Sequence, residues 1–114
     1  MKAREIVRAL ECQVVAGSDL LDREITGGYC ADMLSCVMAR AKAGNVWLTL
    51  QAHPNVVAVA ALLELGAIIV TEGAPIPSEA IAKANDEKIL LLTTPHTTFW
   101  VAGELTRLGM KAQE

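Results

Sequence analysis

Three short and almost wholly apolar runs constrain the fold of this 114-residue chain more than any other feature. They are "VWLTL" (46–50), "AIIV" (67–70) and "ILLLT" (89–93), and each precedes a polar loop with a proline and then a helical pattern. Apolar runs without alternation are typical of strands that are buried on both faces of a sheet. A strand, a loop and a helix used three times in succession indicate a parallel sheet. We therefore predict an α/β fold of three layers, a mostly parallel central sheet with crossover helices on both faces.

Three threonines mark the ends of these runs at a constant interval. Thr49, Thr71 and Thr93 follow one another at spacings of 22 residues, the length of one compact strand–loop–helix unit. The sequence contains no low-complexity stretch and no linker that would separate two units. A chain of this length suits one domain, so we predict a single domain over residues 1–114.

The periodicity of the remaining segments predicts two more strands and five helices. The first strand is "CQVVA" (12–16), and the second is "REITG" (23–27), an edge or near-edge strand that the Gly27–Gly28 pair ends. Helices are predicted over 2–10, 30–43, 54–66, a shorter segment after Pro77, and 97–108. In the helix over 30–43, Asp32 would lie in the first turn, which matches the helix dipole, and Gly44 would end the helix.

The composition excludes several classes of protein. The net charge is −3 and the basic residues are scattered, so we expect no binding of DNA or RNA. The longest apolar region is interrupted by Glu64 and Gly66 and falls short of the ~20 residues that a membrane span needs. The first ten residues carry four charges, which a signal peptide would not tolerate. These features predict a cytoplasmic protein, in which 53% apolar residues leave room for a surface of self-association.

The three cysteines, Cys12, Cys30 and Cys36, are odd in number and show no metal-binding spacing. We expect them to be reduced and to serve as small core residues.

Candidate ligand-binding residues follow the three apolar runs. In open α/β sheets, ligands bind beyond the carboxyl ends of the strands, where helix N-termini also offer free backbone N–H groups to anions. The side chains and backbone expected at that edge belong to Gln51, His53, Asn55, Thr71, Glu72, Gly73, Ser78, Thr94, His96 and Thr97. They offer hydrogen bonds to a small polar ligand.

Structural roles compete with ligand binding at these positions. Thr97 and Ser78 are ordinary helix caps by type and place. His53 and His96 are the two histidines of the chain, and each stands beside a proline in a loop, where a histidine also serves as a cap or faces solvent. No third ligand accompanies them, so we predict neither a metal nor a cofactor.

The motifs of common enzyme classes are missing. The sequence holds no GxxxxGK[ST] phosphate loop, no GxGxxG after its first strand and no GxSxG elbow. An enzyme built on this chain would have to activate water with His53, His96 or Glu72. We therefore predict a protein without catalytic activity.

Three segments carry a resemblance to a known family. "DREITGGYCADMLS", "VWLTLQAHPNVVAVAALLELGAIIVTEG" and "TTPHTTFWVAGELTRLG", in this order over 5–109, resemble a stand-alone DRTGG domain. The resemblance implies a fold similar to the N-terminal domain of HPr kinase/phosphatase, a regulatory role and self-association. Such domains occur beside CBS domains in adenine-nucleotide-regulated pyrophosphatases and before some phosphate acetyltransferases, and related stand-alone proteins accompany iron-only hydrogenase components.

The family's recurrent residues are only partly present. Typical members carry an Asp-Arg pair before a proline at the start of the middle helix, and a Thr-Gly-Gly after the next strand. The matching positions here are Ala52-His53 before Pro54, and Thr71-Glu72-Gly73. The chain keeps Thr71 and Gly73 but lacks the Asp-Arg pair and one glycine.

Two functions follow as hypotheses. In the first, the chain is a dimeric regulatory module that senses an adenine nucleotide or another phosphate-bearing ligand, with backbone N–H groups on the anion and Thr71, His53 and His96 orienting it. In the second, it is an interaction subunit without a small ligand, which docks to a partner enzyme such as an iron-only hydrogenase complex.

Overall fold

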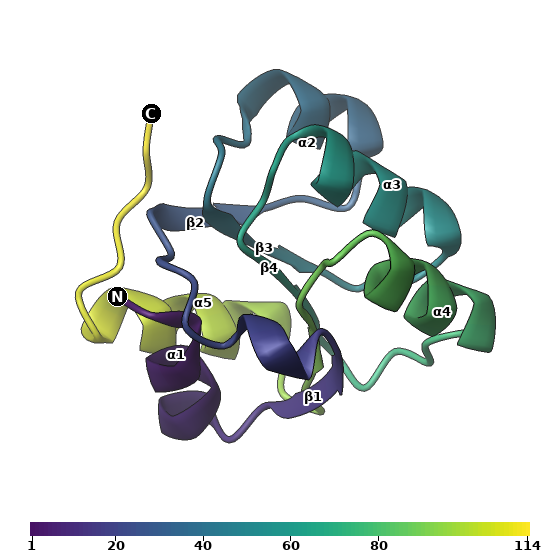
Figure 1. The fold of residues 1–114 in the computed structure, drawn as a ribbon. Coiled ribbons are helices and arrows are strands. Elements are labelled where there is room, and N and C mark those ends of the chain that lie inside the picture. The colour runs from purple at the N-terminus through teal and green to yellow at the C-terminus, as the bar shows by residue number, and fades with distance from the viewer.

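The computed structural model describes residues 1–114 and shows a five-stranded sheet between two layers of helices (Figure 1). The strands are β1 (Gln13–Ala16), β2 (Gly27–Cys30), β3 (Asn45–Thr49), β4 (Ala67–Val70) and β5 (Leu91–Thr93). The helices are α1 (Ala3–Leu10), α2 (Leu34–Arg40), α3 (Pro54–Leu62), α4 (Ser78–Asp86) and α5 (Thr98–Arg107), with a short 3₁₀ turn over Ser18–Leu20.

The sheet has the strand order β1-β5-β4-β3-β2. Strands β2 to β5 are parallel to one another, whereas β1 pairs with β5 in the antiparallel sense. Helices α2, α3 and α4 cover one face, and α1 and α5 cover the other (Figure 1). The predicted three-layer α/β fold with a mostly parallel sheet is confirmed.

The central strands face both helical layers, which explains why their sequences are apolar without interruption. On β3, Trp47 packs into the core on the side of α2, α3 and α4, while Val46 and Leu48 pack into the core on the side of α1 and α5. The same alternation holds on β4, where Ile68 faces the first core and Ile69 the second. All these side chains are buried.

The second strand lies later in the chain than the sequence indicates. Within the predicted strand 23–27, Glu24 forms only an isolated bridge with Lys2, and the strand β2 begins at Gly27. The glycine pair therefore starts a strand instead of ending one. A Cβ atom on Gly27 would lie 2.8 Å from the carbonyl oxygen of Lys111, so the close approach of the C-terminal segment requires this glycine.

Helix α2 is shorter than predicted. It spans Leu34–Arg40 instead of 30–43, because Cys30 completes β2 and Ala31 is hydrogen-bonded through its N–H to the Leu48 carbonyl. Asp32 precedes the helix and does not lie in its first turn, so the dipole argument for Asp32 is wrong. Gly44, with φ +82°, lies in the turn before β3 and does not end the helix.

The cysteines differ from the expectation of three core residues. Cys12 is buried, but Cys30 and Cys36 are exposed, and all three are free thiols. Burial raises the pKa of Cys12 to about 11.

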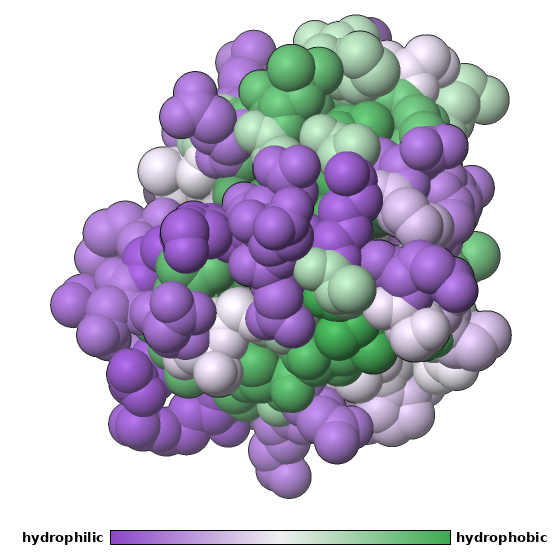
Figure 2. All heavy atoms as spheres, turned by 45° about the vertical axis from the view of Figure 1, so that its right-hand side comes forward, coloured by the Kyte–Doolittle hydropathy of each residue, from purple (hydrophilic) through white to green (hydrophobic).

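Two apolar side chains are exposed on the helical layer that α2, α3 and α4 form. Met38 of α2 is 50% exposed and Leu62 of α3 is 68% exposed. In Figure 2, apolar surface lies in the upper part of the molecule, which is the part that contains α2 and α3 in Figure 1. None of the helices combines the length and the apolar character that a membrane crossing requires.

Candidate functional site at the carboxyl edge of the sheet

The loops that follow β2, β3, β4 and β5 meet at the carboxyl edge of the parallel strands. Three threonines at this edge are buried: Thr49 at the end of β3, Thr71 after β4 and Thr94 after β5. The N–H of Thr71 donates to the Thr49 carbonyl over 3.0 Å, and the two hydroxyls of Thr71 and Thr98 are 2.6 Å apart. The threonines therefore hold the loops together beneath the surface.

The segment Thr71-Glu72-Gly73 ties the loop after β4 to the loop after β5. Glu72 donates its N–H to the His96 carbonyl over 2.8 Å, and Gly73 donates to the Thr94 carbonyl over 3.1 Å. A Glu72 carboxylate oxygen accepts from the N–H of Thr98, the first residue of α5, over 2.8 Å. Both Glu72 (φ +65°) and Gly73 (φ +64°) have left-handed backbone. This conformation suits glycine far better than glutamate.

The N-terminus of α5 is closed by side chains of the protein itself. The Thr97 hydroxyl accepts from the N–H of Trp100 over 3.2 Å, so the cap role of Thr97 is confirmed. Together with the Glu72 carboxylate on Thr98, it occupies two of the N–H groups that a helix start offers. Ser78 is not a cap, because Pro77 takes the N-cap position of α4 and Ser78 is the first helical residue.

The two histidines lie in separate loops and have different neighbours. His53 is the exposed N-cap residue of α3, and its Nε2 lies 3.2 Å from Oε1 of Gln51. The His96 ring stacks on the Trp100 ring with 3.8 Å between centroids and 21° between planes. Asn55 is exposed in the first turn of α3. No three His, Cys, Asp or Glu side chains lie close enough together to hold a metal ion.

Asp32 belongs to this edge, which the sequence did not suggest. Its Oδ1 accepts from the Thr49 hydroxyl over 2.9 Å and from the N–H of Leu50 over 3.0 Å. Although Cys30 is exposed as a whole residue, partial burial of its thiol raises its pKa, and the negative charge of Asp32 raises that pKa further. The sequence signal that could have placed Asp32 at this edge is its position two residues after β2. An acidic residue at that position is compatible with a loop as well as with the first turn of a helix.

Large apolar side chains surround these polar groups. Met33 after β2 is 65% exposed, Leu50 after β3 is 46% exposed, and Phe99 and Trp100 at the start of α5 are 90% and 38% exposed. We call these four side chains the apolar rim. Isolated apolar side chains on a surface are ordinary, whereas a large contiguous apolar patch is typical of an interaction site.

The principal hollows of the molecule lie away from this edge. One lies between α2 and the C-terminal segment, and a second lies at the amino ends of the strands, lined by residues such as Arg23, Glu64 and Lys88. Two more adjoin Met110, beside β2 and beside Ile25. The carboxyl edge therefore presents an open surface, with a stacked aromatic pair and polar groups that are already hydrogen-bonded.

The sequence matches the family model of the DRTGG domain over residues 5–108. This chain belongs to the DRTGG domain family. No curated protein matches it significantly. Among solved structures, it resembles the CBS and DRTGG domains of the regulatory region of Clostridium perfringens pyrophosphatase, solved in complex with the activator diadenosine tetraphosphate. The TM-score is 0.73 at 17% identity, so the likeness shows a shared fold. The match covers 99% of this chain and 51% of that chain, so the DRTGG domain spans about half the length of that relative.

The motif positions of this DRTGG domain fall on the carboxyl edge. Ala52-His53 precede α3, and Thr71-Glu72-Gly73 follow β4. Glu72 stands where the resemblance implies the first glycine of a Thr-Gly-Gly, and its left-handed backbone is a conformation that glycine adopts at little cost. Here the glutamate takes that conformation and its carboxylate caps α5.

Proposed function

We propose that this DRTGG domain is a non-catalytic regulatory module that binds a nucleotide or another phosphate-bearing ligand on the carboxyl edge of its sheet. The stacked pair of His96 and Trp100 carries this proposal. An exposed aromatic ring that a second ring already supports is a platform for a flat base. Stacking of a base on an aromatic side chain contributes about 1–3 kcal/mol.

The phosphate groups of such a ligand have one favoured place on this edge. The first N–H groups of α5 are occupied by Glu72 and Thr97, which leaves less room there for an anion than the sequence suggested. The start of α3 has no side-chain cap, and the imidazole of His53 stands at its N-cap position. We assign the phosphates to this start, with Gln51, His53 and Asn55 as hydrogen-bonding groups.

The relative that shares this fold supports a nucleotide as the ligand. Its regulatory region was solved with diadenosine tetraphosphate as activator. An adenine base and phosphates are the two chemical groups that the Trp100 platform and the His53 region would recognise.

A thermal-shift screen tests the proposal with AMP, ADP, ATP, dinucleoside polyphosphates, acetyl phosphate and inorganic phosphate. A ligand at 100 times its Kd adds about 2.7 kcal/mol of stability. For a domain of this size that corresponds to roughly 10 °C in the unfolding midpoint. The shift should vanish in Trp100→Ala and shrink in His53→Ala. Met38→Ala removes an exposed apolar side chain away from the edge and should leave the shift unchanged. No shift with any of these compounds would contradict the proposal.

The apolar rim favours a second function, that of an interaction subunit. Phe99 is 90% exposed and Met33 is 65% exposed. Apolar surface of this kind suits a homodimer or a partner enzyme, such as the hydrogenase-type complex that the family resemblance implies. Sedimentation of Phe99→Ser tests whether the apolar rim mediates self-association. Loss of a dimer in Phe99→Ser but not in Leu62→Ser would assign the rim to self-association. A monomer in every variant would contradict self-association.

A further inference from the structure

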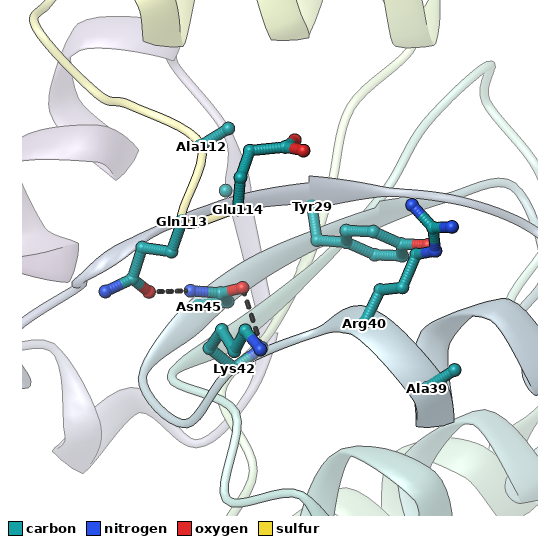
Figure 3. A pocket seen from close by; sticks show the side chains of 9 residues that line it. Tyr29, Ala39, Arg40, Lys42, Asn45, Ala112, Gln113 and Glu114 are labelled. Atoms are coloured by element: carbon teal, nitrogen blue, oxygen red, sulfur yellow. Dashed lines mark hydrogen bonds between the residues drawn. The ribbon is translucent and has the colours of Figure 1, made fainter.

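We propose that the hollow between α2 and the C-terminal segment binds a small oxyanion of the phosphate or sulfate class. The hollow has a volume of about 130 Å³ and lies between α2, the edge strand β2, the start of β3 and residues 112–114 (Figure 3). One water takes about 30 Å³ of liquid, so the space equals roughly four waters. It admits one tetrahedral oxyanion with a water, whereas pockets for drug-sized ligands begin at about 300 Å³.

The walls of this hollow are held in place by specific contacts. Asn45 is 2% exposed, accepts from the N–H of Lys42 over 2.9 Å and donates to Oε1 of Gln113 over 2.6 Å (Figure 3). The Tyr29 hydroxyl donates to the Cys36 carbonyl over 3.2 Å. Gly27 leaves room for the Lys111 carbonyl, where any side chain would collide. The C-terminal segment therefore forms one wall of the hollow, and specific contacts of Gln113 and Lys111 hold it there.

The charges that line the hollow favour an anion. Arg40 and Lys42 both contribute to its wall, and neither takes part in any of the four ion pairs of the chain. A free guanidinium binds the oxygens of phosphate or sulfate in pairs, with directed hydrogen bonds. Glu114 contributes the one carboxylate side chain of the lining, and this side chain forms no ion pair either.

A second polar hollow, at the amino ends of the strands, is lined by Arg23 and Lys88 and by the carboxylates of Glu64 and Glu87. Its lining therefore holds as many carboxylates as cations, whereas the hollow beside α2 is lined by two cations and the carboxylate side chain of Glu114. This difference favours an anion in the hollow beside α2.

An NMR titration of the backbone amides tests this site with sodium phosphate against sodium chloride of equal ionic strength. Saturable shifts are expected at Gly28, Tyr29, Lys42 and Asn45. Arg40→Gln and Lys42→Gln should each weaken phosphate binding about tenfold, the effect of losing one charge-assisted hydrogen bond. Glu114→Gln should strengthen it, because the competing carboxylate is gone.

Arg8→Gln is the matched control, since it removes an exposed positive charge from α1, remote from the hollow. It should leave phosphate binding unchanged. Shifts that chloride reproduces, or an equal loss in Arg8→Gln, would mean general screening and would overturn the site. Saturable phosphate shifts confined to His53 and its neighbours would also overturn it, while leaving the proposed function of the carboxyl edge intact.

Discussion

Glu72 and Thr98 are joined by a hydrogen bond of 2.8 Å, in which a carboxylate oxygen of Glu72 accepts from the N–H at the start of α5. The bond connects the loop after β4 to the helix after β5, so it links two of the units that make up the sheet edge. It forms although Glu72 has left-handed backbone, with φ +65°. The cap therefore offsets an unfavourable backbone conformation.

The first prediction separates these two contributions. Glu72→Ala removes the cap and keeps the unfavourable backbone, which should lower the free energy of unfolding by about 1–2 kcal/mol. Glu72→Gly also removes the cap but relieves the backbone, which recovers about 1 kcal/mol. Urea unfolding of the three proteins should place Glu72→Gly between the wild type and Glu72→Ala. Equal stability of the alanine and glycine variants would show that the backbone at Glu72 is not strained.

The second prediction concerns two glycines with opposite surroundings. Gly103 lies inside α5, and a Cβ atom there would meet nothing within 4 Å. Gly103→Ala should therefore raise the free energy of unfolding by about 0.5–1 kcal/mol. Gly27→Ala places its Cβ 2.8 Å from the Lys111 carbonyl and should destabilise by about 1–3 kcal/mol. Thermal unfolding measures both, and a neutral Gly27→Ala would show that the C-terminal segment does not rest on β2.

The third prediction is a loss of stability at alkaline pH. Burial raises the pKa of Cys12 from 9.0 to about 11, so between these values the folded protein holds a proton that the unfolded chain releases. The stabilisation is complete below about pH 9 and is lost as the pH rises towards 11, on the order of 2 kcal/mol in all. Unfolding measured from pH 8 to 10.5 should show a smaller decline in Cys12→Ala than in the wild type. An equal loss of stability in both proteins would contradict the assignment to Cys12, because the other groups that titrate at alkaline pH are present in both.

The fourth prediction concerns Cys30 and Asp32. Burial and then the Asp32 charge raise the pKa of the Cys30 thiol. Asp32→Asn keeps an oxygen for the Thr49 hydroxyl and the Leu50 N–H but removes the charge, so the pKa of Cys30 should fall and its thiolate fraction should rise. Alkylation of Cys30 at pH 8, followed by mass spectrometry, should become faster. Exposed Cys36 is the internal reference, and an equal acceleration of both thiols would indicate loosening instead of electrostatics.

The central strands could be predicted from the sequence because their environment is uniform. β3, β4 and β5 are buried by helices on both faces, and continuous apolar sequence reports that directly. The loop residues at the carboxyl edge followed from the same reasoning, and Thr97 was recognised as a cap by its type and position.

Contacts between distant parts of the chain could not be predicted in this way. Gly27 lies against the segment around Lys111, and Asp32 is hydrogen-bonded to the end of β3. Local sequence rules do not include these contacts, so they predicted the end of a strand at Gly27 and the first turn of a helix at Asp32. Glu72 shows the same limit, since its partner Thr98 follows the next strand. The exposure of Phe99 could not be predicted from the sequence, because apolar residues on a helix normally indicate its buried face.

The fluorescence of Trp100 under titration with ADP tests the proposed function most directly. Trp47 is fully buried, so a base that stacks at the carboxyl edge should quench only Trp100. We expect saturable quenching that disappears in Trp100→Phe, while the stabilisation of that variant by ADP persists because phenylalanine still offers a flat ring. Fluorescence that stays unchanged up to millimolar ADP, or quenching that survives in Trp100→Phe, would contradict a nucleotide site at this edge.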